Sequence, residues 1–144
     1  MFWSIFLSKN KKLVRRWKKE HKKIVILANK VIDSYTKRDL KATQKALVAL
    51  NDVAIEHLMT EDIEFYRILK DKKKVDEDME QLINEFTLSF KDTKHVLRDF
   101  LLTYTKDDAA LDSRFFETFK SIVETLSKRI TFEEENLYKV LASK

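Results

Sequence analysis

The sequence predicts an all-α protein, an antiparallel up-down-up-down four-helix bundle, and three observations support this prediction. Apolar residues recur at helical spacing through four long segments of the 144-residue chain. Short polar runs separate these segments, and connections this short favour antiparallel neighbours. The chain contains no glycine and no proline, so it lacks the residues that hairpins, tight turns and bulges use most often.

The boundaries of the helices follow from the periodicity and from the polar runs. Helices are expected at about 10–36, 40–70, 75–105 and 109–142, joined by KRD (37–39), KDKKK (70–74) and KDD (106–108). Asp39 is expected to cap the second helix. We assign residues 10–144 to the bundle and residues 1–9 to an apolar and basic N-terminal tip.

The second and fourth helices end in similar sequences, HLMTEDIEFYRIL (57–69) and RITFEEENLYKVL (129–141). Aligned at an offset of 72 residues, Glu61 falls on Glu133 and Tyr66 falls on Tyr138. This offset is a whole number of helical turns, so both copies face their helices the same way. The first and third helices match more faintly. We therefore predict two duplicated helical hairpins.

The missing residue types exclude several classes of site. Without glycine, phosphate-binding and dinucleotide-binding loops are excluded. Without cysteine, disulfides, thiolate metal sites and cysteine nucleophiles are excluded, which fits a reducing cytosol, and we expect a cytoplasmic protein. No nucleophile–base pair stands out, and the tyrosines at helical spacing are interpreted as core residues, so enzymatic activity is not expected.

The net charge of +5 is concentrated near the N-terminus. The run SKNKKLVRRWKKEHKK (8–23) contains nine lysines and arginines and one glutamate, and the first interpretation is a solvated helix face. No nucleic-acid-binding motif accompanies it. The apolar start MFWSIFL (1–7) is too short for a transmembrane segment. Together with the basic run, it is consistent with peripheral membrane contact through residues 1–23. A protein partner stays open as well.

Two of the three histidines are placed to face the core. One helical turn separates His57 from Glu61, so both project from the same side of the second helix. His21 lies in the middle of the apolar stripe of the first helix. At 100° per residue, His95 falls on the polar side of the third helix, and only a one-residue π-bulge would turn it inward.

These residues resemble the hemerythrin-like, or HHE cation-binding, family over roughly residues 14–141. The resemblance implies a four-helix bundle with a di-iron centre between its helices. Carried over by position, His21 matches the ligand of the first helix. His57 and Glu61 match the His-x-x-x-Glu pair of the second helix, and Glu133 matches the carboxylate of the fourth. In the acidic run EEE (133–135), Glu133 is expected to face inward and its two neighbours outward.

The second half of the chain departs from the family pattern. Lys94 and Arg129 stand where the resemblance implies histidine ligands on the third and fourth helices. A unit positive charge about 5 Å from a dication repels it by roughly 6–7 kcal/mol at an effective dielectric constant near 20. We therefore expect a degenerate site. Either no metal is bound and Lys94 and Arg129 form an internal ion-pair network with Glu61 and Glu133, or one metal ion is bound by His21, His57 and Glu61.

Two other ligand arrangements stay open. A complete di-iron centre is the least favoured, because Lys94 and Arg129 would both have to turn away from the cavity. Glu56, which precedes His57, is a conceivable additional ligand.

Two functions are consistent with these features. The first is a non-enzymatic, hemerythrin-like binding or sensing protein that handles a metal ion or dioxygen. The alternative is a metal-free protein-interaction module, such as an anti-sigma-like regulator of transcription. LVRRW (13–17) and RITFEEE (129–135) resemble segments of those regulators.

Overall fold

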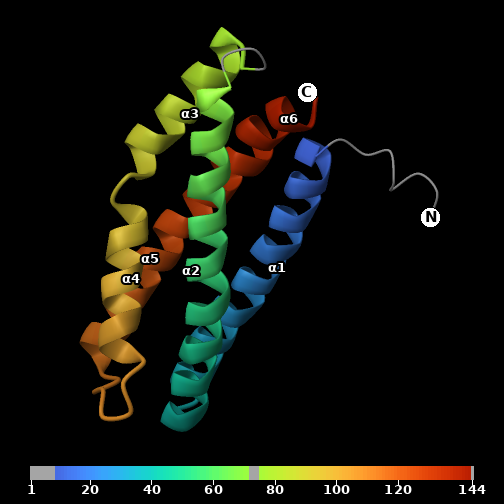
Figure 1. The fold of residues 1–144 in the computed structure, drawn as a ribbon. Coiled ribbons are helices and arrows are strands. Elements are labelled where there is room, and N and C mark those ends of the chain that lie inside the picture. The colour runs from blue at the N-terminus through green and yellow to red at the C-terminus, as the bar shows by residue number, and fades with distance from the viewer. Residues whose placement is uncertain (1–8, 72–74, 144) are drawn as a thin grey trace, which may run out of the picture.

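The computed structural model describes residues 9–71 and 75–143, and these residues contain helices and no strand. The predicted tip (1–9) therefore lies outside the described residues except for Lys9, as does 72–74 of the second connection. Four helical arms lie together in a bundle (Figure 1). The first arm is α1 and the second is α2; α3 and α4 form the third, and α5, the π-helical η2 and α6 form the fourth. The helices are α1 (Lys9–Thr36), α2 (Leu40–Lys70), α3 (Glu77–Phe90), α4 (Thr93–Tyr104), α5 (Ser113–Phe132), η2 (Glu133–Leu137) and α6 (Tyr138–Ala142).

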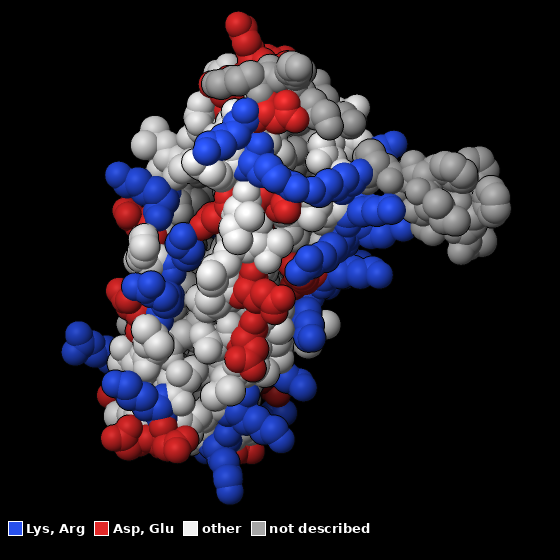
Figure 2. Space-filling model, in the orientation of Figure 1, with Lys and Arg blue, Asp and Glu red and all other residues white. Residues whose placement is uncertain are grey.

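The all-α four-helix prediction is confirmed, and the first two helices have nearly the predicted bounds. The cap at Asp39 is confirmed as well, because its carboxylate accepts a hydrogen bond from the backbone N–H of Ala42 at 3.1 Å. The antiparallel order and the duplication of the hairpins stay predictions. Figure 2 shows basic side chains gathered along α1, and the nine lysines and arginines between 9 and 23 are all exposed, as a solvated helix face requires.

The connection between α1 and α2 turns through a left-handed residue. Arg38 has φ of 61°. Its N–H donates to the carbonyl of Tyr35, and the N–H of Asp39 donates to the carbonyl of Ser34, each at 2.9 Å. This is the hydrogen-bond pattern of a Schellman motif, whose left-handed position is usually glycine. Because the chain has no glycine, an arginine occupies that position.

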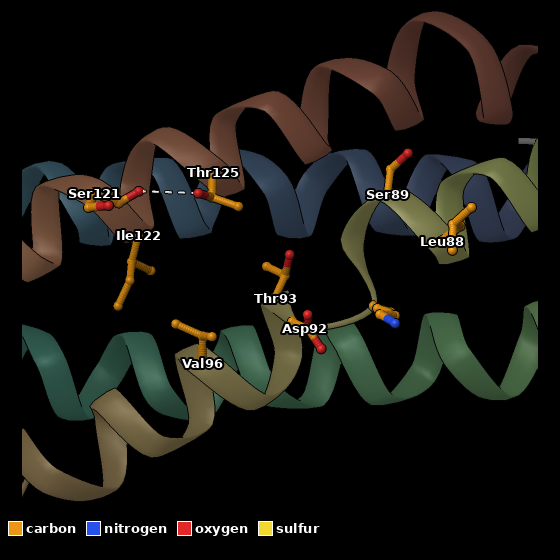
Figure 3. A pocket seen from close by; sticks show the side chains of 9 residues that line it. Leu88, Ser89, Asp92, Thr93, Val96, Ser121, Ile122 and Thr125 are labelled. Carbon is orange, nitrogen blue, oxygen red and sulfur yellow. Dashed lines mark hydrogen bonds between the residues drawn. The ribbon is translucent and has the colours of Figure 1, made fainter.

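The prediction of one continuous third helix was wrong, because the helix breaks at Lys91 and Asp92. The surrounding sequence is rich in Thr, Ser and Asp, which have low helix propensity. Both residues keep right-handed backbone angles, so the buried face continues in phase from Phe86 to Leu97. Figure 3 shows the break beside α5, and a pocket of about 270 Å³ lies between the break and the part of α5 that carries Ile122 and Thr125.

The fourth arm also differs from the prediction, since it begins at Ser113 and not near residue 109. The carboxylate of Asp112 accepts a hydrogen bond from the N–H of Phe115 at 3.0 Å and so fixes the start of α5. Further along, residues Glu133–Leu137 form a π-helical turn. The sequence had raised a π-bulge only near His95, in the third helix.

The buried apolar residues form two clusters with a polar layer between them. One cluster includes Ile24 and Leu58, and the other includes Trp17 and Phe65. His21 lies between Trp17 and Ile24 along α1, so the polar residues occupy the level where the two clusters meet. Among the described helices, none combines the length and the apolar character needed to cross a membrane.

Candidate metal centre

Four buried polar side chains meet in this layer: His21 from α1, His57 and Glu61 from α2, and Glu133 from η2. Each is at most 2% exposed. Each offers one nitrogen or oxygen atom, and these atoms all lie within 4.8 Å of one another. The structure thus brings together the four residues that the sequence suggested as metal ligands.

Two carboxylates orient the histidines from outside the cluster. His21 Nδ1 lies 2.7 Å from Glu134 Oε2, and His57 Nδ1 lies 2.7 Å from Glu20 Oε1. Because a carboxylate accepts hydrogen bonds, each Nδ1 carries a proton and donates it. The Nε2 atoms then point inward and lie 3.0 Å apart. A carboxylate that holds the outer nitrogen of an imidazole is the usual second shell of a metal-binding histidine.

The inward nitrogens face two carboxylate oxygens. His57 Nε2 lies 2.8 Å from Glu61 Oε1, and His21 Nε2 lies 3.4 Å from Glu133 Oε1. Both oxygens are buried, and apart from these nitrogens neither has a hydrogen-bond partner. Ligand atoms about 2.0–2.1 Å from a tetrahedral ion lie about 3.3 Å from each other. The donor set therefore fits one metal ion with small adjustments.

Tyr138 closes the cluster on the side of η2. Its hydroxyl donates to Glu61 Oε2 at 2.7 Å and lies 3.2 Å from Glu133 Oε2. Residues five apart, such as Glu133 and Tyr138, point about 140° apart in a regular α-helix. The π-helical turn between them adds a residue to the turn and lets both face inward. In the second helix, which has no such turn, Tyr66 is 61% exposed whereas Tyr138 is fully buried.

The two carboxyl groups have pKa values shifted in opposite directions. Burial raises the pKa of Glu133 well above its usual value, and the charge of nearby Glu61 raises it further. Burial also opposes ionisation of Glu61. Hydrogen bonds with Glu133 and His57, together with the charges of His57 and Arg129, outweigh burial and lower the pKa of Glu61 to about 2. Of the two carboxyl groups, Glu133 is therefore the one that holds a proton more readily.

The pKa values of the two histidines are also shifted in opposite directions. Burial lowers the pKa of His21, and the hydrogen bond to Glu134 does not fully compensate. Burial acts in the same direction on His57, but its hydrogen bonds to Glu61 and Glu20 and the charges of those carboxylates outweigh burial and raise its pKa. His57 is therefore the histidine that takes up a second proton more readily.

Arg129 enters the cluster, whereas Lys94 does not. The buried guanidinium of Arg129 places Nη2 3.7 Å from Glu61 Oε1 and Nε 3.8 Å from Glu133 Oε1. It also lies 4.7 Å from the ring centroid of Phe86. Lys94 Nζ instead pairs with Asp62 Oδ2 at 2.6 Å on the surface. The internal network expected to contain both cations is thus not formed, and Arg129 alone reaches the carboxylates.

The remaining candidates lie outside the cluster. His95 is exposed on α4, as its position on the helical wheel predicted. Glu56 is 72% exposed on its side chain and lies 3.9 Å from Arg16, so it does not approach the ligand atoms.

Sequence reasoning missed three residues of the site. Glu134 was expected to point outward, Tyr138 was interpreted as core, and Glu20 was not considered. Glu20 carried a signal, because it is the single acid in the basic run 8–23. Nothing in the sequence marked the π-helical turn that brings in Tyr138.

A small cavity adjoins the cluster. Its volume is about 10 Å³, and its polar lining comes from His21, His57, Arg129 and Glu133. The rest of its wall is apolar, with Ile24 among the lining residues. A cavity of this size is at the lower limit for one water molecule.

Comparison with known proteins gives one match. The family model for the hemerythrin HHE cation-binding domain matches residues 12–141. No curated protein and no solved structure matched the chain.

Proposed function

This chain belongs to the hemerythrin HHE cation-binding domain family, and we propose that it is a non-enzymatic protein that binds one divalent metal ion. The ligands are His21, His57, Glu61 and Glu133. The observation that carries the proposal is the orientation of the two histidines. Their outer nitrogens are held by carboxylates, and their inner nitrogens face two carboxylate oxygens that have no other hydrogen-bond partner. Metal-binding histidines are usually oriented in this way.

The geometry supports one ion and not two. The sequence had favoured a metal-free site because two cations were expected in the cavity. Lys94 lies at the surface with Asp62, so only Arg129 opposes a metal. Its guanidinium lies 3.7 and 3.8 Å from the two carboxylate oxygens that face the histidines, so a positive charge already stands beside the site where a second ion would have to bind. Arg129 cannot lose its proton at ordinary pH, and it therefore takes the place of the second cation.

The ligand set suggests which ions bind. Two imidazole nitrogens and two carboxylate oxygens suit iron, zinc or manganese better than calcium or magnesium. We propose iron, in line with the family. When bound, iron would supply an open coordination position for a small ligand such as dioxygen.

A binding or sensing role fits the space beside the ligands. A cavity of about 10 Å³ admits a water-sized molecule and no organic substrate. This restriction supports a protein that senses or stores a small ligand or a metal ion. It argues against an enzyme that acts on organic molecules at this site.

The test is the metal content of the purified protein. Protein expressed with added iron, and protein reconstituted anaerobically, should contain about one ion per chain. The double variant His21→Ala/His57→Ala should contain none. Two ions per chain would contradict the single-ion proposal, and no ion in the wild type under any loading condition would contradict metal binding.

A second proposal concerns a protein partner. Met59, Ile63 and Tyr66 recur at intervals of four and three residues on α2, and each is more than half exposed. Such a stripe on a helix is a common docking surface. It supports the alternative of a protein-interaction module, for example an anti-sigma-like regulator. Purified sigma factor or RNA polymerase should bind the wild type and not the variant Ile63→Asp; failure of the wild type to bind would contradict this role.

Three further expectations belong with these proposals. The helices are antiparallel, and the two hairpins arose by duplication, which the convergence of Glu61 and Glu133 on one centre supports. The cysteine-free sequence supports a cytoplasmic location. The exposed basic face of α1 supports peripheral contact with an anionic membrane.

A further inference from the structure

A second hollow lies beside the metal centre, and Arg129 borders both. It is a cleft of about 300 Å³ between α2 and the third arm. Pockets that bind small molecules start at about this volume. The cleft is distinct from the cavity of about 10 Å³ beside the histidines.

The walls of the cleft are mostly apolar and aromatic. Phe65, Ile83 and Phe86 are buried in its wall, and Phe90 is half-buried. The rings of Phe86 and Phe90 lie 5.4 Å apart between centroids. An apolar ligand body would bury itself against these rings, which is the usual source of affinity in small pockets.

The charged groups of the cleft are mostly positive. Lys91, Lys94 and Arg129 line it, against the single acid Asp62. Asp62 already pairs with Lys94 at 2.6 Å. Lys91 forms no ion pair within the described part of the chain. The cleft therefore has an excess of positive charge that an anion would balance.

Arg129 is also short of hydrogen-bond partners. Its Nε and Nη2 atoms are buried and unpartnered. Nη2 lies 3.7 Å from Glu61 Oε1 and Nε lies 3.8 Å from Glu133 Oε1, both beyond hydrogen-bond length. These two atoms face the metal centre, while the residue also lines the cleft. The positive charge of Arg129 on this wall attracts a carboxylate, whose planar shape a guanidinium matches.

We propose that this cleft binds a small organic monocarboxylate with an apolar body. The carboxylate lies toward Arg129 and Lys91, and the apolar body lies against Phe86 and Phe90. Binding in the cleft does not require a metal ion.

The test compares acids with their neutral amides. Benzoate and hexanoate are titrated into the full-length protein by calorimetry and by NMR, with benzamide and hexanamide as matched neutral probes. We expect each acid to bind at least about tenfold more tightly than its amide, since hydrogen bonds to charged groups are the stronger ones. Chemical-shift changes should centre on Phe86, Phe90 and Lys91.

Three variants locate the anion. Arg129→Gln should weaken benzoate binding about tenfold or more. Lys128→Gln is the matched control, because Lys128 is an exposed neighbour that pairs with Glu124 outside the cleft; it should leave binding unchanged. Arg129→Gln also removes a partner of Glu61, so a second variant is needed. The double variant Lys91→Gln/Lys94→Gln changes one exposed and one half-buried residue, and it should weaken benzoate binding several fold.

The outcomes are distinct. Each of three results would overturn the proposal. The first is equal affinity for acid and amide, and the second is that both cleft variants bind benzoate as tightly as the wild type. The third is chemical-shift changes that lie away from the cleft. Binding of benzoate to a protein that takes up no metal would leave this proposal standing and contradict the proposed function. Metal uptake without benzoate binding, in both the metal-free and the metal-loaded protein, would support the proposed function and contradict the cleft proposal.

Discussion

The Nε2 atoms of His21 and His57 lie 3.0 Å apart, while the Nδ1 atom of each ring contacts a carboxylate at 2.7 Å. Two nitrogen lone pairs face each other at such a distance only when a proton or a cation lies between or beside them. In the metal-free protein, His57 is the ring that takes up this proton more readily, because its pKa is raised. A metal ion that binds here must displace it.

The outer carboxylates should matter for metal affinity. Glu134→Gln and Glu20→Gln each replace a charged acceptor of an imidazole N–H with a neutral amide, and each is expected to weaken metal binding about 10–100-fold. Affinity is measured by competition with a chelator. Glu135→Gln is the control, because Glu135 is exposed one residue further along. Equal affinities of the Glu134 and Glu135 variants would contradict the assigned role.

Metal affinity should depend on pH through His57. Its pKa is raised above 6.5 in the metal-free protein, so a proton competes with the metal until the pH exceeds that raised value. Affinity should therefore increase as pH rises through the pKa of His57, and loss of the proton from Glu133, whose pKa is also raised, should act in the same direction. The stability of the metal-free fold should change with pH in the opposite direction. The stabilisation from protonated His57 is fully present below pH 6.5 and is lost as the pH rises through the pKa of His57 in the folded protein.

Glu20→Gln provides the check on this pH dependence. It removes a carboxylate that raises the pKa of His57, so the rise in metal affinity should move to lower pH. Chelator competition repeated across the pH range for wild type and variant measures the shift. An unchanged midpoint would show that another group governs the proton release.

The two aligned tyrosines should respond differently to loss of the hydroxyl. Tyr138→Phe leaves buried Glu61 without its 2.7 Å donor and should lower the free energy of unfolding by about 1–3 kcal/mol. Tyr66→Phe alters an exposed residue and should change stability by less than about 0.5 kcal/mol. Chemical denaturation of both metal-free variants measures the difference. Equal effects would mean that the Tyr138 hydroxyl contributes nothing specific.

The contrast between these tyrosines shows how far sequence reasoning reaches. Periodicity located the helical arms and the inward faces of His21, His57 and Glu61, because apolar neighbours fix which side of a helix is buried. Glu133 followed from its alignment with Glu61 and from the family resemblance. The alignment of Tyr66 with Tyr138 assumed regular helices on both sides. A π-helical turn adds one residue to a turn with no change in composition, so periodicity does not reveal it.

Long polar side chains were harder to place than apolar ones. Lys94 and Arg129 occupy equivalent ligand positions in the sequence, yet Lys94 reaches Asp62 at the surface while Arg129 stays buried over Phe86. Flexible stems allow either outcome, and the partner available within reach decides it. The outward expectation for Glu134 failed for the same reason, since its side chain reaches His21 from the edge of the bundle.

Restoring histidine at both substituted positions should permit a second metal ion. Lys94 and Arg129 line the same cleft, so Lys94→His/Arg129→His would remove the opposing cation and supply two neutral nitrogen ligands. We expect metal content to rise from about one to about two ions per chain. Lys94→His alone should stay near one, because Arg129 remains over the carboxylates. A double variant that still holds one ion would undermine the view that Arg129 replaces a second metal.

Arg38 offers a route to a more stable protein, because an arginine is held there at φ of 61°. A left-handed conformation costs an L-residue with a side chain roughly 1–2 kcal/mol, and glycine adopts it freely. Arg38→Gly also removes a guanidinium that lies 5.4 Å from the ring centroid of Tyr35, a contact worth about 0.5–1 kcal/mol at exposed sites. The net expectation is a gain of about 0.5–1 kcal/mol in the free energy of unfolding.

Lys30→Gly is the control, at an exposed position inside α1. It should lower the free energy of unfolding by about 1 kcal/mol, because glycine is unfavourable within a helix. Denaturant unfolding of both variants separates the two effects, and a loss of stability in Arg38→Gly equal to that of Lys30→Gly would contradict the left-handed turn.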